Sequence, residues 1–419
     1  MKALAPGRPI EDNELAEFLG DALAEVGSLT ERVLAIVPDD TRTIPMPTIF
    51  AVLCARLAPR VKELTFLVAL GTHPAMTRRQ LADHFGRGQP EPSNVRILQH
   101  EWRNPAALTT VGEISAAEVE RSSRGLQSEA IPVRIHRLAV EADRILIVNP
   151  VFPHEVVGFS GGHKYFFPGI GGAEMLDASH WLGALITNPK VNGHKETPVR
   201  SLIELASDMI STPRLGLSLV LSGHDVVGAF FGDVRAAWSA AADLSARVNI
   251  VWKKRPYHTV ISVAPAMYRD LWTAGKCMYK LEPVVADGGT LVVYAPHIEE
   301  VSPTHGEWIE RVGYHTRDFF LAQGEKYADV PRTVLAHSTH VKGIGTYRSG
   351  VERPRIEVVL ATGIPETMCR RINLDYRDPA SIDVEAFADR EDEGVLLVRN
   401  AGEQLYRLAS GDVPNIERL

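Results

Sequence analysis

Short apolar runs alternate along this chain with stretches of helical periodicity. Four of the runs in the first 250 residues are wholly or almost wholly apolar, as in strands covered on both faces; they are residues 33–37, 64–70, 145–148 and 217–221. Helical patterns cover residues 11–24, 47–57 and 235–248, and Thr77 to Gln80 fit a capping box that opens another helix. Strands separated by helices predict βαβ units and a parallel sheet.

The same pattern restarts after the basic stretch Lys253-Lys254-Arg255-Pro256. It predicts a strand over 259–263, a helix over 270–285, and strands over 290–294 and 356–361. We therefore expect an α/β fold of two α/β domains with largely parallel sheets, with an active-site cleft between the domains. The predicted domains span residues 1–254 and 255–395, and residues 396–419 form a C-terminal segment that packs back on the first domain.

Composition narrows the function classes. The 419 residues carry a net charge of −7, which argues against a general nucleic-acid or anionic-membrane surface. No 18-residue apolar window predicts a membrane span. The three cysteines, Cys54, Cys277 and Cys369, are too scattered for a disulfide framework or a zinc site, so we expect a cytoplasmic protein.

Polar residues follow three of the predicted strands. The first strand is followed by Asp39 to Arg42, the second by Gly71-Thr72-His73, and a third by Asn149 to His154. The carboxyl ends of parallel strands are the usual place for an active site. Each residue also has an ordinary interpretation: an aspartate that closes a turn, an arginine in a surface ion pair, or a histidine with a structural hydrogen bond.

A glycine-rich stretch carries the densest chemistry. Gly158-Phe159-Ser160-Gly161-Gly162 is followed by Lys164 and Pro168-Gly169, with His154 before it and His180 after it. Glycine amides can bind an anion, a lysine can form a covalent bond, and a histidine can bind a metal. The stretch is neither a Walker loop nor a zinc-protease helix, because His163, Tyr165 and Gly158 occupy the positions that those motifs reserve for other residues. A solvated lysine and a packed helical histidine are the alternatives.

Taken together, these residues resemble the nickel-pincer lactate racemase family. The similarity rests on the segments 39–42, 71–73 and 158–169, on His154 and His180, and on Lys276 farther along the chain. It covers nearly the whole sequence. The resemblance implies a racemase or epimerase of a 2-hydroxy carboxylic acid that works by hydride transfer through a 2-keto acid.

The resemblance also implies a cofactor, the nickel pincer nucleotide, which is a pyridinium mononucleotide with two sulfur-bearing arms. Lys164 would carry it covalently and His180 would bind its nickel. The phosphate of the cofactor would lie on the glycine run, which contributes Gly158, Ser160, Gly161 and Gly162. Asp39 and Thr41 would help to place the cofactor. Cofactor-synthesis proteins would be transient partners.

For the substrate, the resemblance assigns His73 and His154 as two opposed bases and Arg42 as the carboxylate-binding group. Lys276 would either polarise the developing carbonyl or pair with the carboxylate. Thr273 stands where the family often has glutamine, which favours a bulkier or more polar acid than lactate, such as a sugar acid. The equivalent of the family's substrate-contacting tryptophan is unassigned; Tyr347 and Tyr376 are candidates.

Two other functions remain open from the sequence. The first is a cofactor-free protein that binds a small carboxylate on the same fold. The second is a metal-free lyase with Lys164 as a Schiff-base lysine. Retention of both Lys164 and His180 disfavours the first, and activity without nickel would favour the second.

Overall fold

The computed structural model describes residues 1–24, 26–86 and 92–415. The chain forms two compact units, each built from separated segments. Unit 1 comprises Met1–Phe152, Phe159–Leu176 and Arg200–Val248, and unit 2 comprises Pro153–Gly158, Asp177–Val199 and Asn249–Leu419. The last crossing between units lies near the predicted boundary at residue 254, but the chain also crosses in the 153–199 region, where the sequence pattern predicted no boundary.

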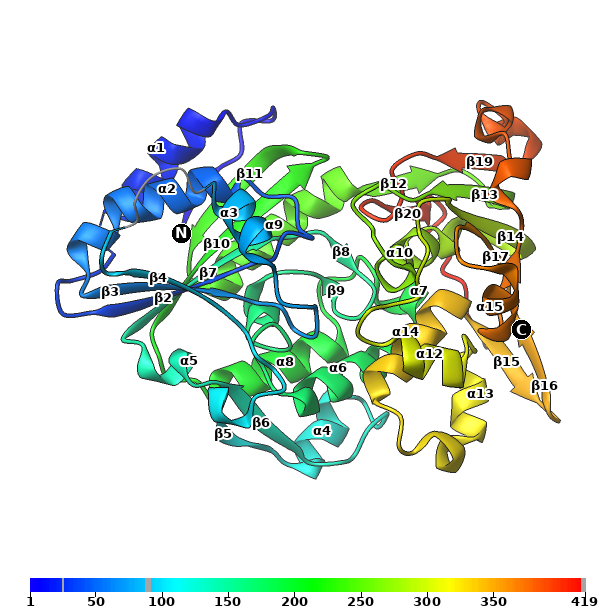
Figure 1. Cartoon of the computed structure of the whole chain (residues 1–419), viewed down its shortest axis with the longest axis horizontal. Coiled ribbons are helices and arrows are strands. Elements are labelled where there is room, and N and C mark those ends of the chain that lie inside the picture. The colour runs from blue at the N-terminus through cyan, green and yellow to red at the C-terminus, as the bar shows by residue number, and fades with distance from the viewer. Residues whose placement is uncertain (25, 87–91, 416–419) are drawn as a thin grey trace. The chain divides into compact units, whose positions relative to one another are not determined.

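A seven-stranded sheet forms the centre of unit 1 (Figure 1). Its order is β1-β11-β10-β7-β2-β3-β4; the five strands from β10 to β4 run parallel, and β11 and β1 add antiparallel at one edge. The bounds are β1 Lys2–Leu4, β2 Arg32–Val37, β3 Glu63–Val68, β4 Val95–Gln99, β7 Arg144–Pro150, β10 Arg214–Ser222 and β11 Asp225–Gly232. All four apolar runs predicted as strands are strands of this sheet.

The helices of unit 1 also follow the sequence pattern. The predicted helices correspond to α1 (Asp12–Ala22), α2 (Met46–Arg56) and α9 (Val234–Asn249), and Thr77 forms the expected capping box with Gln80 at the start of α3 (Arg78–Phe85). The remaining elements are β5 Leu108–Ile114, α4 Ala116–Ser122, β6 Ile131–His136, α5 Leu138–Glu141, α6 Ala173–Ile186 and α8 Pro198–Asp208, of which α6 and α8 each continue into unit 2.

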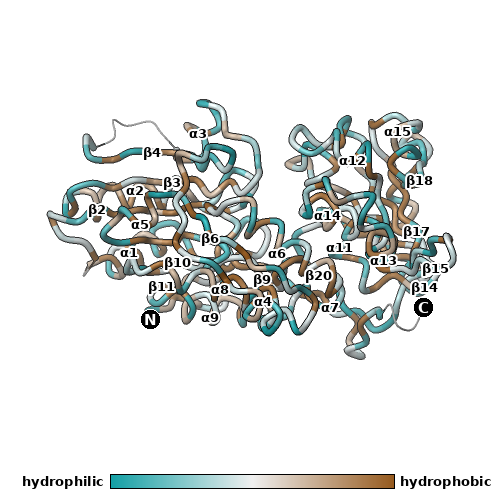
Figure 2. Tube along the Cα trace, turned by 90° about the horizontal axis from the view of Figure 1, so that it is seen from below, coloured by the Kyte–Doolittle hydropathy of each residue, from teal (hydrophilic) through white to brown (hydrophobic). Residues whose placement is uncertain are grey.

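The core of unit 1 packs between the sheet and α1 to α3. Phe50, Phe66 and Phe85, from α2, β3 and α3, are buried and meet with ring centroids 4.9–5.8 Å apart. Aromatic groups at this distance contribute beyond their buried area. Hydrophobic stretches follow the strands of this sheet in Figure 2.

Unit 2 contains a five-stranded, wholly parallel sheet in the order β18-β17-β14-β13-β19. Its strands are β13 Tyr257–Val263, β14 Val285–Ala295, β17 Glu357–Thr362, β18 Asp375–Tyr376 and β19 Val395–Val398. Two further strand pairs lie outside this sheet. One is a parallel pair of β12 (Ile250–Lys253) and β20 (Leu405–Leu408), and the other is a hairpin of β15 (Gly345–Arg348) and β16 (Val351–Pro354). The helices are α7 Asn188–Val191, α10 Leu271–Ala274, α11 Lys276–Tyr279, α12 Gly306–Val312, α13 Arg317–Ala322, α14 Arg332–Lys342 and α15 Glu366–Arg371. The fold is thus α/β with mostly parallel sheets, as predicted.

One predicted helix is wrong in detail. Residues 270–285 form two four-residue helices, α10 and α11, and a single 3-10 turn over Glu282–Val284. The carbonyl of Tyr279 would need the amide of residue 283, which is proline, and Asn188 Nδ2 donates to that carbonyl instead (2.8 Å). Ser262 Oγ likewise donates to the Cys277 carbonyl (2.7 Å). Side chains distant in sequence therefore replace the bonds of a continuous helix.

The C-terminal segment lies elsewhere than the sequence pattern suggested. Residues 396–415 belong to unit 2, where β19 pairs with β13 and β20 pairs with β12. Residues 416–419 lie outside the described part of the chain. In the described segments no helix combines the length and apolarity needed to cross a membrane.

The strand order creates a topological switch in each sheet. From β2 the chain adds β3 and β4 on one side and then β7 and β10 on the other. In unit 2, β14, β17 and β18 lie on one side of β13, and β19 lies on the other. Ligands of open parallel sheets bind outside the carboxyl ends of the strands at such a switch. The loops after β2 and β7, and those after β13 and β19, are therefore the places to look for a site.

Candidate active site

The predicted site residues divide between the two units. Unit 1 carries Asp39, Thr41, Arg42, His73, Ser160, Gly161, Gly162 and Lys164. Unit 2 carries His154, Gly158, His180, Thr273 and Lys276.

The loop after β2 brings a carboxylate and an imidazole together. Asp39 is 4% exposed, and its Oδ1 accepts bonds from the Thr41 hydroxyl (2.6 Å) and amide (3.2 Å). Its Oδ2 lies 2.5 Å from His73 Nδ1, which the loop after β3 supplies. Asp39 does close a turn, as its ordinary interpretation required, but its second oxygen orients a histidine.

Asp39 is held in its charged form. Burial alone would raise the pKa of this carboxyl, but the His73 and Arg42 charges and the bonds from His73 and Thr41 outweigh burial and lower its pKa far below the ordinary value. Since the carboxylate can only accept, His73 Nδ1 must carry a proton toward it. The lone pair of neutral His73 is therefore on Nε2.

Arg42 lies at the same switch point. Its guanidinium is 5.4 Å from the ring centroid of Phe152, which follows β7. The buried Tyr165 hydroxyl is also close: burial raises its pKa, and the Arg42 and Asp39 charges act on it in opposite directions. The turn that carries Tyr165 thus packs against the loop after β2. Asp39, Thr41, Arg42 and His73 thus lie close together at one edge of the sheet, and Arg42 supplies a cation there.

The glycine run has a structural role that the sequence did not reveal. Trp238 Nε1 donates to the Ser160 carbonyl (2.8 Å), and the buried Arg200 donates to the carbonyls of Phe159 (2.6 Å) and Gly161 (3.1 Å). The Arg200 guanidinium also stacks over Trp238 at 4.1 Å. Both residues lie far along the chain from the loop that they hold: Arg200 is 39 and 41 positions from the carbonyls that it binds, and Trp238 is 78 positions from Ser160.

Two amides of the run already donate within the protein. Ser160 donates to the Phe152 carbonyl (2.8 Å), and Gly162 donates to Asn149 Oδ1 (3.2 Å). The predicted phosphate contacts of this run would therefore come from its other amides. Lys164 is partly exposed, whereas Gly161 to His163 before it and Tyr165 to Pro168 after it are all buried.

His163 lies in the same turn and has its own carboxylate. Its Nδ1 is 2.6 Å from Glu204 Oε2, which Arg235 Nε also contacts at 2.5 Å. Burial would raise the pKa of Glu204, but the His163 hydrogen bond and charge, together with Arg235 and Arg200, lower the pKa to about 2.

This pair predicts a pH-dependent stability. A depressed carboxyl pKa stabilises the fold above the unfolded value near 4.5, and this contribution is lost as the pH falls toward 2. Glu204→Gln should lower the free energy of unfolding at pH 7 by on the order of 2–3 kcal/mol and flatten its acid dependence between about pH 5 and 2.5. Urea unfolding at pH 7 and across the range from about pH 5 to 2.5 would measure the free energy of unfolding. Glu120→Gln, at an exposed position, is the control, and an equally steep acid dependence in Glu204→Gln would contradict the assignment.

In unit 2, His154 lies in the short strand β8 (Pro153–His154) and is buried. Its Nδ1 accepts the Val156 amide (3.1 Å) and lies 3.4 Å from Glu155 Oε2. Burial would raise the pKa of Glu155, but the charges of Lys280, His340 and Lys276 lower it. Glu155 was not among the predicted site residues, because beside His154 it suggested only a zinc-protease helix that the sequence does not complete.

Lys276 lies at the switch point of unit 2. Its Nζ is 4.8 Å from the ring centroid of Tyr268, in the loop after β13. Gly402, in the loop after β19, approaches so closely that a Cβ there would be 3.1 Å from Lys276 Cβ. Thr273 lies one turn earlier, and its amide donates to Asp270 Oδ1 (2.7 Å). The geometry thus places both residues where a ligand of this sheet is expected.

An aromatic stack adjoins Thr273. The Trp272 ring lies between His337 (centroids 3.7 Å apart) and His305 (4.3 Å). Burial lowers the pKa of His337 well below the ordinary value, and the charges of His340, His305 and His180 add to the effect. His180 of α6 is therefore close enough to His337 for its charge to affect the pKa of that residue. No sequence motif marked Trp272, which neighbours the predicted substrate residue Thr273.

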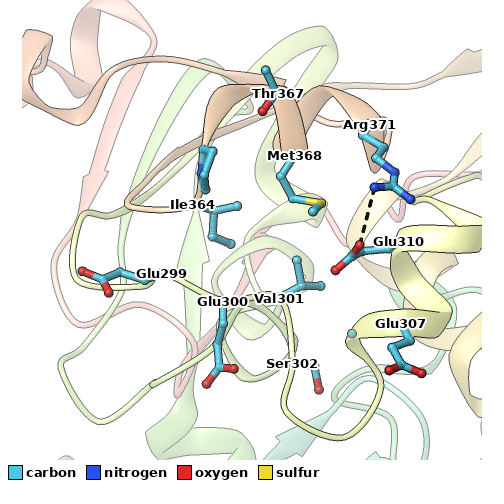
Figure 3. Close-up of a pocket in the computed structure, with 12 residues that line it drawn as sticks. Glu299, Glu300, Val301, Ser302, Glu307, Glu310, Ile364, Thr367, Met368 and Arg371 are labelled. Carbon is cyan, nitrogen blue, oxygen red and sulfur yellow. Dashed lines mark ion pairs between the residues drawn. The ribbon is translucent and has the colours of Figure 1, made fainter.

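A pocket of about 540 Å³ lies beside this region, at the carboxyl ends of β14 and β17 (Figure 3). Glu299, Glu300, Glu307 and Glu310 lie around it, so it disfavours an anion. Its loop carbonyls at Glu300 and Val301 accept the amides of Leu271 and Trp272 (3.0 and 2.9 Å). The loop that lines the pocket thus holds the backbone of Trp272 in place. The glutamates around the pocket make it unsuited to a carboxylate. In the described part of the chain, no group of three or more His, Cys, Asp or Glu is placed to hold a metal ion.

Comparison with known proteins shows which proteins this chain is similar to. A model of the lactate racemase N-terminal domain matches residues 10–192. The chain is 25% identical over 295 residues to lactate racemase of Thermoanaerobacterium thermosaccharolyticum, which covers 68% of this chain and 63% of that enzyme. It is also 25% identical over 286 residues to lactate racemase of Lactiplantibacillus plantarum, covering 66% and 62%. Residues 10–192 therefore match the lactate racemase N-terminal domain family.

Two solved structures share the fold over nearly all of this chain. The crystal structure of a Thermotoga maritima protein has a TM-score of 0.89 and 33% identity, covering 97% of this chain and all of that one. The lactate racemase apoprotein of T. thermosaccharolyticum shares the fold, with a TM-score of 0.72, 17% identity and coverage of 95% and 93%. In the sequence alignments the chain spans less than two thirds of the length of the two lactate racemases.

Proposed function

We propose that this chain is a nickel-pincer-dependent racemase or epimerase of a 2-hydroxy carboxylic acid. The observation that carries the proposal is the buried Asp39 carboxylate paired with His73 Nδ1 at the carboxyl ends of β2 and β3. This pair leaves the basic lone pair of His73 on Nε2, and the resemblance to lactate racemases predicts that it meets a substrate hydroxyl. The relatives named lactate racemase support the reaction class.

The protein residues handle the substrate in three ways. His73 Nε2 takes the hydroxyl proton while the Cα–H bond breaks with its electron pair leaving as hydride, so the substrate becomes a 2-keto acid. Arg42 binds the carboxylate with its planar guanidinium. Lys276 polarises the developing carbonyl. Reduction of the keto acid on its opposite face, with His154 returning a proton to the oxygen, would complete the inversion.

The residues present fit the proposed cofactor by their donor chemistry. Lys164 is the one partly exposed residue in an otherwise buried stretch, as an anchoring amine requires, and His180 offers an imidazole, which suits Ni(II). When bound, the group would supply the hydride acceptor. Asp39 and Thr41, which the resemblance assigns to cofactor placement, bond to each other and to His73, so we propose that they also position the base.

The substrate is a 2-hydroxy acid. Thr273 is shorter than the glutamine common in the family, and it adjoins the Trp272 stack with its two histidines. This combination favours an acid longer and more polar than lactate, such as a sugar acid.

The proposal is tested by coexpression with the cofactor-making enzymes, followed by intact mass, metal analysis and chiral chromatography of candidate acids. We expect a mass increment on Lys164, about one nickel per chain and racemisation of at least one acid. Lys164→Ala should lose both increment and nickel, whereas Lys254→Ala, at an exposed lysine, should retain both. An unmodified Lys164 in the coexpressed protein would favour the carboxylate-binding alternative, and nickel-independent activity trapped by borohydride would favour a Schiff-base lyase.

A further inference from the structure

The two histidines assigned to the substrate have different partners on the same ring atom. His73 Nδ1 faces a buried carboxylate oxygen, Asp39 Oδ2, at 2.5 Å. His154 Nδ1 receives the backbone amide of Val156 at 3.1 Å. A carboxylate can only accept a hydrogen bond, and an amide N–H can only donate one. The two rings therefore face opposite requirements at Nδ1.

These partners determine the neutral tautomers. His73 must carry its proton on Nδ1, which leaves the lone pair on Nε2. His154 must keep its lone pair on Nδ1 for the Val156 amide, which puts the proton on Nε2. Of the two neutral rings, only His73 can accept a proton at Nε2.

A second group competes for His154 Nδ1. Glu155 Oε2 lies 3.4 Å from it, and the Glu155 side chain is 15% exposed. Lys280 and Lys276 hold Glu155 in its charged form, with His340 also facing it. Lys280 is itself buried and donates to the Pro153 carbonyl, next to His154. The carboxylate is thus a fixed negative charge beside the ring.

We propose that Glu155 is the positioning residue that makes His154 competent in proton transfer. This inference rests on the proposed function. In the neutral resting form, His154 is bonded to Val156 and is inactive as a base. A proton on Nδ1 requires the ring to exchange the Val156 amide for Glu155, and this exchange gives His154 the same arrangement that Asp39 gives His73.

The proton balance then follows. For one enantiomer, the substrate O–H bond breaks and its proton moves to His73 Nε2. For the other enantiomer, the proton moves to His154 Nε2, whose lone pair is available only when Nδ1–H points to Glu155. Each acid form returns its proton to the carbonyl oxygen as the C–H bond reforms. The two half-sites are therefore unequal: His73 is ready as a base, whereas His154 requires an exchange of partners.

Nitrogen NMR of protein labelled with 15N-histidine tests the tautomers directly, on the full chain without cofactor. His73→Gln and His154→Gln assign the two rings. At neutral pH we expect the unprotonated nitrogen to be Nε2 in His73 and Nδ1 in His154. An unprotonated Nε2 in His154 would overturn the proposal.

Glu155→Gln tests the positioning role. Near pH ~6, close to the ordinary histidine pKa, the doubly protonated fraction of His154 should fall severalfold, whereas His73 should be unaffected. In the cofactor-loaded enzyme, single-turnover oxidation of one enantiomer should slow by about 10²-fold and that of the other by less than about threefold. Glu307→Gln, an exposed glutamate of unit 2, is the control.

An unchanged His154 spectrum in Glu155→Gln would overturn the role of Glu155. The NMR result does not depend on catalysis. Expected tautomers in a protein that racemises nothing after cofactor loading would therefore refute the proposed function and leave the assignment of hydrogen-bond partners intact.

Discussion

Asp39→Asn is expected to lower the racemisation rate by about 10³–10⁴-fold, the size of effect seen when the carboxylate that orients a catalytic histidine is neutralised. An asparagine can turn its NH₂ group toward His73 Nδ1, which would move the ring proton to Nε2 and remove the basic lone pair. The side chain keeps its size and its bond to Thr41, so the fold should be retained. Chiral chromatography of the cofactor-loaded enzyme measures the rate.

The matched control is the neighbouring carboxylate. Asp40 accepts a bond from Gln80 Nε2 (2.9 Å), and Asp40→Asn should remain within about threefold of the wild-type rate. His73→Ala should be at least as damaging as Asp39→Asn while retaining nickel, because neither residue is assigned as a metal ligand. Wild-type turnover in Asp39→Asn, or nickel loss in His73→Ala, would contradict the assignment of His73 as the oriented base.

Gly161→Ala should be strongly destabilising. The residue has a φ of +80°, and an added Cβ would lie 2.3 Å from Asn149 Oδ1 and 2.8 Å from Val151 Cγ2. Asn149 is fully buried and its side chain bonds the Gly162 amide and the Leu217 carbonyl, so it cannot move aside. Backbone strain and overpacking together should cost about 3–4 kcal/mol of unfolding free energy.

Gly125→Ala isolates the backbone contribution. Gly125 has nearly the same φ, +82°, but nothing lies within 4 Å of a Cβ there, so its cost should be about 1–2 kcal/mol. Urea unfolding of both variants gives the difference, and soluble yield reports it if Gly161→Ala does not fold. Equal destabilisation of the two would mean that the run is not held by close packing.

Much of the framework could be predicted from local pattern alone. A continuous apolar run such as residues 33–37 has one stable solution, a strand covered on both faces, and the Thr77–Gln80 box marks a helix start within four residues. The same patterns put Asp39 and His73 directly after strands. Since parallel strands end at a common edge, their meeting followed from the order of the elements.

Other features depend on groups far apart in the chain, and only the tertiary structure decided them. Arg200 and Trp238 hold the glycine run from 39 to 78 positions away, and Asn188 replaces a helix bond at Tyr279 across 91 positions. Whether Val156 or Glu155 is the partner of His154 likewise depends on the distances from its Nδ1, 3.1 Å and 3.4 Å, which sequence spacing does not determine. The sequence by itself determined the elements and the edge at which the polar residues gather, because both follow from hydrophobic burial along a short segment. The tertiary structure decided which atoms meet there, because hydrogen bonds and charges act over a few ångströms regardless of distance along the chain.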